Sequence, residues 1–232
     1  MVMTTNKMLP AIFALAAILV FSPLAASAAS YVPEAQSVVG QTSLYKSILE
    51  TENVTTETFN LPQAIAFDED NRMIIADTEN NRVLIIPENP LTQQTIVLGQ
   101  PDETSTIANN PAIIDVKAQL AKPTAVAITA DEKLVVVDSA NDRVVIFEKD
   151  STTQDFVTAQ AASIVLSQVH TETTAPVESQ TLQSPMDVVI APNGDIIVAD
   201  TENNRVVVYN DNDQLPTTSK FVDTMTPVAV IR

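Results

Sequence analysis

The chain has 232 residues, a formal net charge of −17 and no cysteine. Such an acidic chain has no basic patch to neutralise phosphates, which argues against nucleic acid and against anionic membrane surfaces as partners. Without disulfides, core packing and strand pairing alone must hold the fold.

The first 28 residues have the pattern of a secretory signal peptide. One early charge, Lys7, precedes an apolar run over residues 11–21, and small residues at 26–28 offer a cleavage site. The apolar run is short for a membrane span, so the sequence predicts export with removal of residues 1–28, to the periplasm, the cell envelope or the medium. A retained anchor is the alternative. Residues 29–232 then suffice for one domain.

The remainder of the chain is organised around a 25-residue pattern that occurs three times, at residues 62–86, 123–147 and 185–209. In each copy, a recurring aspartate stands 15 positions after the opening proline, and an arginine stands five positions after the aspartate. The period is 61 residues and then 62. A fixed period with a fixed interior indicates a repeat architecture.

Each copy contains three apolar runs of four to five residues, rich in β-branched side chains and separated by polar turns. In the third copy, Asn193 and Gly194 form the first of these turns, a pair typical of hairpins. The runs are too short for helices and predict strands. Because they are almost continuously apolar, we expect both faces of the resulting sheet to be covered.

A fourth strand is predicted upstream of each copy, from the segments "SVVGQ" at residues 37–41, "IVLGQ" at 96–100 and "IVLSQ" at 164–168. Radial repetition of such four-stranded units is the pattern of a β-propeller. A long polar insert follows each of these strands, at residues 42–60, 101–119 and 169–181. Loops of this length are usually functional or disordered, so we expect any partner to bind there.

The motif "ADTENNRV" occurs at residues 76–83 and 199–206, with "VDSANDRV" at 137–144. With the strands around it, this motif resembles the NHL repeat. The resemblance implies an all-β chain, a β-propeller of NHL type with about three four-stranded blades, in a family whose rings most often have six. The chain would then be a partial ring, or half of a ring completed by a homodimer or by a longer parent chain. Residues 227–232 repeat the opening of the second copy and predict the start of a fourth unit.

Charged residues and asparagine recur around the "DTENNRV" turn. An aspartate can accept backbone N–H groups at a turn, asparagine tolerates the left-handed conformation, and the arginine can pair with the carboxylate. Recurrence in every copy indicates architecture, because a catalytic group is normally needed once. The predicted structural motif comprises Asp77, Asn81, Arg82, Asp138, Asn141, Arg143, Asp200, Asn204 and Arg205.

The family that the chain resembles includes enzymes, so the resemblance leaves a catalytic role open. A histidine-built zinc site is excluded within one chain, because His170 is the only histidine. A calcium-dependent propeller enzyme would instead need oxygen ligands near the central axis. Asp187 is the candidate metal ligand, since it stands on the opening strand where the other copies have Ala64 and Ala125.

Two functional hypotheses follow. The first is an exported, non-enzymatic propeller scaffold without a cofactor, which binds another protein or an extracellular ligand through its loops. The alternative is a hydrolase or lyase that uses Ca²⁺ near Asp187.

Overall fold

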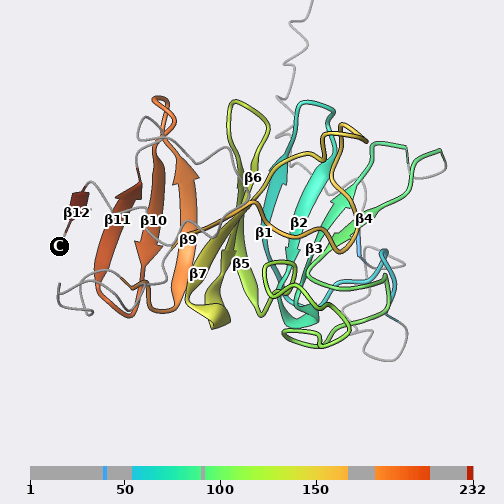
Figure 1. Ribbon diagram of the computed structural model, residues 1–232, viewed down its shortest axis with the longest axis horizontal. Coiled ribbons are helices and arrows are strands. Elements are labelled where there is room, and N and C mark those ends of the chain that lie inside the picture. Colours follow the sequence, from blue (N-terminus) through green and yellow to red (C-terminus); the bar gives the residue numbers. More distant parts are fainter. Residues whose placement is uncertain (1–38, 41–53, 90–91, 167–180, 210–228, 232) are drawn as a thin grey trace, which may run out of the picture. The chain divides into compact units, whose positions relative to one another are not determined.

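The computed structural model describes residues 39–40, 54–89, 92–166, 181–209 and 229–231 (Figure 1). Within them, strands form three four-stranded antiparallel sheets, and helix is confined to two short 3-10 turns. None of the helical segments in this part of the chain has the length and apolar character that a bilayer crossing needs. The predicted all-β fold of about three blades is therefore confirmed.

Each sheet is called a blade below, and its strands follow chain order from one edge to the other. Blade 1 consists of β1 (Pro62–Phe67), β2 (Met73–Asp77), β3 (Arg82–Ile86) and β4 (Ile96–Leu98). Blade 2 consists of β5 (Pro123–Ile128), β6 (Leu134–Asp138), β7 (Arg143–Phe147) and β8 (Ile164–Leu166). Blade 3 consists of β9 (Pro185–Ile190), β10 (Ile196–Asp200), β11 (Arg205–Tyr209) and β12 (Ala229–Ile231).

The fourth strand of each blade lies downstream of its copy, not upstream. β4 pairs with β3 and β8 with β7, so each closes the blade of the copy that precedes it. β12 pairs with β11 in the same way, so residues 229–231 complete blade 3 where the sequence predicted a fourth unit beginning at 227–232. The physical reason is that a strand pairs most readily with the free edge left by the strand just before it. Of the segment at 37–41, only Val39 and Gly40 are described, and they form a bend.

The second and third strands of each blade are joined by a tight turn. In blade 1 the 3-10 turn η1 (Thr78–Asn80) ends at Asn81, which has φ 53°. In blade 2 the turn η2 (Ser139–Asn141) ends at Asp142 with φ 52°, and in blade 3 Asn204 has φ 51°. Asparagine and aspartate occupy this left-handed position because their short polar side chains make it less costly than other residues do.

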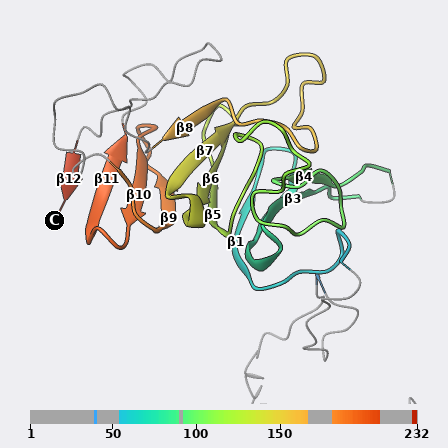
Figure 2. The same ribbon diagram turned by 60° about the horizontal axis from the view of Figure 1, so that its bottom comes forward.

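The blades pack face to face, with β5 beside both β1 and β9 (Figure 2). One apolar cluster joins blades 1 and 2 and includes Ile85 and Phe147. A second cluster joins blades 2 and 3 and includes Ile146 and Tyr209. Every residue of β6 and β7 is buried, which confirms the expectation that both faces of this sheet are covered.

The Gly-Gln pair after β4 attaches the following insert to blade 1. Gly99 has φ +88°, and a Cβ added there would lie 2.7 Å from the Leu120 side chain, so only glycine fits. The fully buried Gln100 donates from Nε2 to the carbonyl oxygens of Asn81 and Ile107, both at 2.9 Å. Its Oε1 accepts a hydrogen bond from Asn110 at 3.0 Å. The insert is thereby fixed to the blade.

Candidate functional site

The recurring aspartate and arginine form a buried, fully hydrogen-bonded pair. In blade 1, Asp77 accepts the Asn60 N–H at 2.7 Å through Oδ1, and Asn80 (2.9 Å) and Arg82 Nε (2.7 Å) through Oδ2. Both side chains of the ion pair are 0% exposed. Arg82 also donates to the carbonyl oxygens of Thr55 and Thr58 at 2.7 and 2.9 Å. The pair therefore ties the loop before β1 to the turn after β2.

Blades 2 and 3 repeat this arrangement. The Nε–Oδ2 distances are 2.7 Å for Arg143 with Asp138 and 2.5 Å for Arg205 with Asp200. The same carboxylates accept the backbone N–H groups of Ala121 at 2.7 Å and Gln183 at 2.6 Å. Burial raises the pKa of Asp138, while its hydrogen bonds and Arg143 act in the opposite direction. In each blade these groups therefore hold the loop before the first strand to the turn after the second strand.

The asparagines of the predicted motif occupy two different positions. The residue three after the aspartate donates to it, as Asn141 does to Asp138 at 2.7 Å and Asn203 does to Asp200 at 2.9 Å. Asn81 and Asn204 are instead the left-handed residues that end the turn. Asn80 and Asn203 were therefore missed, although asparagine three residues after the aspartate in all three copies was a signal for them.

The predicted metal ligand Asp187 lies on β9, the first strand of blade 3. It is exposed, and its Oδ1 accepts the N–H of the adjacent Val188 at 2.9 Å. Among the described residues, no three His, Cys, Asp or Glu side chains are grouped as metal binding would need. Calcium binding at Asp187 stays a prediction, which a calcium titration of the chain and of Asp187→Asn checks. His170 lies outside the described residues.

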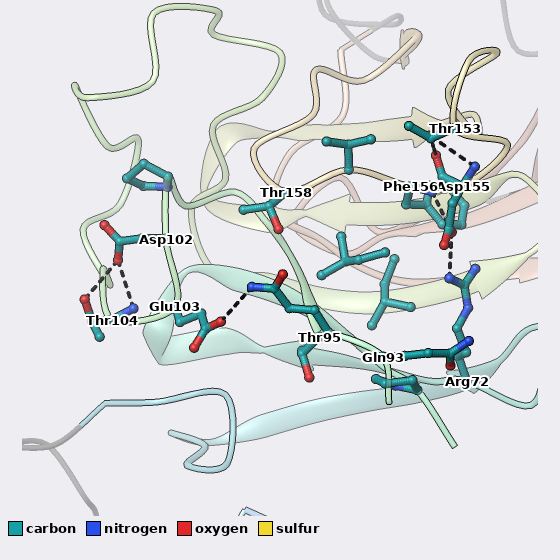
Figure 3. Close-up of a pocket in the computed structure, with 16 residues that line it drawn as sticks. Arg72, Gln93, Thr95, Asp102, Glu103, Thr104, Thr153, Asp155, Phe156 and Thr158 are labelled. Carbon is teal, nitrogen blue, oxygen red and sulfur yellow. Dashed lines mark hydrogen bonds and ion pairs between the residues drawn. The ribbon is translucent and has the colours of Figure 1, made fainter. Parts of the chain in front are cut away.

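Loops of blades 1 and 2 enclose a pocket of about 910 Å³, called the loop pocket below (Figure 3). Its walls come from the connection between β3 and β4, from residues 101–104 of the second insert, and from residues 153–158 between β7 and β8. The sequence pointed to the second insert but missed the other two loops, because neither carries a recurring motif. The insert at 169–181 is described only at Thr181, and the insert at 42–60 only from residue 54 onward.

The lining of the loop pocket combines apolar, hydroxyl and acidic groups. Apolar surface comes from residues such as Ile96 and Val157. Thr158 accepts the Val97 N–H through Oγ1 at 3.2 Å, and Gln94 donates to Glu103 at 3.3 Å. Such a mixed lining suits a ligand that has both apolar and hydrogen-bonding parts.

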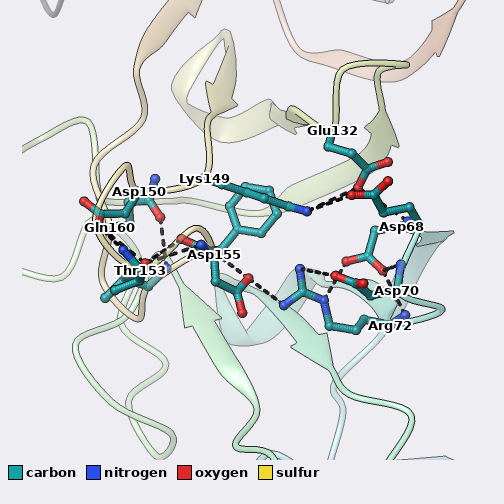
Figure 4. Close-up of polar contacts among 12 residues, drawn as sticks. Asp68, Asp70, Arg72, Glu132, Lys149, Asp150, Thr153, Asp155 and Gln160 are labelled. Atoms are coloured by element: carbon teal, nitrogen blue, oxygen red, sulfur yellow. Dashed lines mark hydrogen bonds and ion pairs between the residues drawn. The ribbon is translucent and has the colours of Figure 1, made fainter.

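Arg72 connects the two blades beside this pocket (Figure 4). Its Nε lies 2.6 Å from Asp68 Oδ2 in its own blade, and its Nη1 lies 2.6 Å from Asp155 Oδ1 in blade 2. Nη2 has no hydrogen-bond partner among the described residues and lies 4.0 Å from Asp70 Oδ2. The guanidinium carbon is 5.9 Å from the centroid of the Phe156 ring. Burial alone would lower the pKa of Arg72, but the hydrogen bonds to Asp155 and Asp68 outweigh it and raise the pKa.

A second ionic contact joins the same two blades. Lys149 Nζ lies 3.5 Å from Glu69 Oε1 and 3.6 Å from Glu132 Oε2. The position of Arg72 is occupied by Lys133 in blade 2 and by Asp195 in blade 3, so the link through Arg72 belongs to one junction. Arg72 could not be predicted from the repeat, because its position is not shared by the three copies.

The NHL repeat family model matches residues 59–86 and 182–209. Among solved structures, the chain is similar to virginiamycin B lyase from Staphylococcus aureus, with 14% identity, a TM-score of 0.40, and coverage of 65% of this chain and 38% of that one. It is also similar to a candidate 6-phosphogluconolactonase from Bacteroides uniformis, with 15% identity, a TM-score of 0.32, and coverage of 73% and 57%. No curated protein matches the sequence. The chain therefore contains NHL repeats in its first and third copies, and its second copy is built in the same way.

Proposed function

We propose that this chain is a propeller-type scaffold that binds a segment of another protein in the loop pocket. The observation that carries the proposal is that loops outside the strands build this pocket, while the recurring charged residues are used in holding the blades. Binding residues on loops that a rigid scaffold positions are a common arrangement in proteins.

The charge of the pocket favours a basic partner. Asp102 and Glu103 lie along its lining and form no ion pair among the described residues, whereas Arg72 is already paired with Asp68 and Asp155. The chain as a whole has a formal net charge of −17. Complementary charge steers association and selects among partners, so the preferred segment carries lysine or arginine.

A displayed peptide library tests the proposal. Peptides selected on the wild-type chain should be enriched in lysine and arginine, and their affinity should fall at least about tenfold for Glu103→Lys, which reverses one charge of the lining. Glu57→Lys is the matched control, because it makes the same change at an exposed residue that is not part of the lining. Peptides without a basic bias, or equal loss for both variants, would overturn the proposal.

We further propose that the scaffold acts outside the cytoplasm, on the strength of the signal pattern in residues 1–28. Fractionation of expressing cells followed by N-terminal sequencing checks this. The mature chain should begin at Ala29 and be recovered from an exported fraction. A chain that keeps residues 1–28 and sediments with membranes would favour the retained anchor.

A further inference from the structure

The outer edge of blade 1 is the free side of its last strand, β4, and loops meet its backbone at two places. The Val97 N–H donates to Thr158 Oγ1 at 3.2 Å, and the Val97 carbonyl oxygen accepts the Ala159 N–H at 2.9 Å. Two residues further along, Gly99 forms a parallel bridge with Gln119 of the second insert. Loops thus protect an edge that would otherwise be open to pairing with another chain.

Thr95 is the next position along the same edge, in the direction away from Gly99. In an antiparallel ladder, the backbone groups of residues two apart point to the same side of the strand, so Thr95 shares the side of Val97. In the part of the chain that the structure describes, neither the N–H nor the carbonyl oxygen of Thr95 has a hydrogen-bond partner. One donor and one acceptor of this edge are therefore still free.

These free groups belong to a residue that lines the loop pocket (Figure 3). Thr95 is partly exposed, and its neighbours Gln94 and Ile96 are part of the same lining. The pocket has a volume of about 910 Å³. A ligand that enters it therefore meets a residue whose backbone hydrogen bonds have not yet been made.

The conformation of the ligand follows from this requirement. A helix uses its backbone N–H and C=O groups for its own hydrogen bonds, so it has none to offer along its length. An extended segment has free N–H and C=O groups, and such segments add as a strand to the open edge of a sheet. Pairing with one edge residue supplies two backbone hydrogen bonds.

We propose that the protein segment bound in the loop pocket is extended and adds to blade 1 as a short fifth strand, paired with the backbone of Thr95. It continues the line of edge contacts that Thr158 and Ala159 make at Val97. This inference rests on the proposed function, because it specifies how the basic segment binds at that same site.

The pairing also sets the spacing of side chains in the segment. Successive side chains of a strand point to opposite faces, so the two neighbours of the paired residue lie on the face of Gln94 and Ile96. Ile96 offers an apolar contact, and Gln94 donates to Glu103, whose carboxylate attracts a cation. The preferred segment therefore has an apolar residue and a lysine or arginine two positions apart.

Amide hydrogen exchange measured by nuclear magnetic resonance tests the pairing, with the tightest-binding peptide from the displayed library as the probe. With saturating peptide the Thr95 N–H should exchange at least about tenfold more slowly, because it gains an acceptor. The Val97 N–H, which already has an acceptor, should change little. If a peptide loses affinity for Glu103→Lys but leaves exchange at Thr95 unchanged, the strand pairing is wrong and the proposed function stands. If the library yields no such peptide, both are wrong.

A proline at position 95 removes the donor. Thr95 stands just before β4 at the edge of the sheet, where proline is tolerated, so Thr95→Pro should keep the circular dichroism of the strands. Its affinity for the same peptide should fall at least about tenfold. Ala130→Pro is the matched control, because Ala130 is exposed outside the pocket lining, its N–H has no partner among the described residues, and blade 3 has Pro192 at the same place in its turn. Wild-type affinity in Thr95→Pro, or an equal loss in both variants, would contradict the pairing.

N-methylated peptides give a second measurement on the wild-type chain, which holds even where Thr95→Pro does not fold. One N–H of the segment meets the Thr95 carbonyl oxygen, and the N–H groups on either side of it point away from the edge. Methylation at that one position should lower the affinity at least about tenfold, and methylation at the two adjacent positions should leave it nearly unchanged. Equal tolerance, or equal loss, at every position would show that the segment is not held through its backbone.

Discussion

At the scale of the residue, the recurring aspartate–arginine pair stabilises each blade through the hydrogen bonds that it makes to neighbouring segments. Removing two charges from water is costly, and the cost is offset only when the remaining lone pairs and protons also find partners. Asp77 meets that condition with a backbone N–H and the Asn80 amide, and Arg82 with carbonyl oxygens of the preceding loop. The pair therefore joins three segments of the blade that the strand ladder alone does not hold.

Arg82→Met should lower the free energy of unfolding by about 3–5 kcal/mol, because it leaves the Asp77 carboxylate buried without its cation. Urea unfolding followed by circular dichroism measures this. Lys122→Met removes the partner of Glu79 in a pair whose side chains are 54% and 36% exposed, and should cost less than about 1 kcal/mol. Similar losses for both variants would contradict a structural role specific to the buried pair.

The contribution of the left-handed asparagines to the free energy of unfolding can be separated into a backbone part and a side-chain part. Glycine adopts φ near 53° without strain, so Asn81→Gly removes only the side-chain bonds to Lys122, Thr106 and Glu79. We expect a loss of about 1–3 kcal/mol in urea unfolding. Asn204→Gly, measured at a concentration where the chain is monomeric, should cost only a few tenths of a kcal/mol, since Asn204 makes one long bond to Glu202. An equal loss at both positions would mean that backbone conformation dominates.

At the scale of the element, two loops beside the pocket depend on ionised aspartates. Hydrogen bonds from the backbone N–H groups of Thr104 and Ser105 lower the pKa of Asp102, and those of Thr153 and Thr152 lower the pKa of Asp150. A carboxylate whose pKa is lower in the folded state stabilises it above the ordinary value of 3.8, and this contribution is lost as the pH falls through the folded value. The loops should therefore loosen only in strong acid.

This pH dependence can be followed by nuclear magnetic resonance. The carboxyl carbons of Asp102 and Asp150 should titrate below the ordinary value of 3.8, and the amides of Ser105 and Thr153 should move with them. Asp102→Asn should abolish the response of the first loop and leave that of the second. Titration midpoints of these carboxyl groups at or above the ordinary value would show that the turns do not stabilise the charged carboxylates.

The strands were predictable from the sequence because their signal is local. An apolar run between turn residues specifies a strand, and such runs form the first three strands of each blade in all three copies. The pairing of β4 was not predictable in the same way, since adjacency in sequence does not say which edge a strand joins. The loop pocket was harder still, because it depends on Arg72 meeting Asp155, 83 residues away and without equivalents in the other copies. Features that recur in every copy can be recognised from one sequence, whereas a contact that occurs once is seen only in the folded structure.

At the scale of the whole molecule, the three described blades are built alike and differ mainly in which of their faces a neighbouring blade covers. Blade 2 has a neighbour on each face and is buried throughout its central strands. Blade 1 and blade 3 each have one neighbour among the described residues and an exposed apolar residue on the opposite face, Ile65 and Val189. Stability should therefore depend on whether those faces are covered.

Thermal unfolding gives a prediction at this scale. If two copies associate, the midpoint temperature should rise with protein concentration, because dilution favours the separated chains. A midpoint independent of concentration would show that two copies do not associate.

The hydrogen bond between blades has a consequence for how the copies can diverge. Between blades 1 and 2 the Lys122 N–H donates to Asn81 Oδ1, and between blades 2 and 3 the Ser184 N–H donates to Asp142 Oδ1. The donor is a backbone N–H in both cases, so the side chain of the donor residue takes no part in the bond. The three copies have Leu61, Lys122 and Ser184 at this position, three chemically different residues. Proline is barred because it has no N–H to donate, and β-branched residues are disfavoured because φ at these positions is 43–50°. Because the junction uses a backbone N–H, the residue before the opening proline can differ between copies while the blades still join.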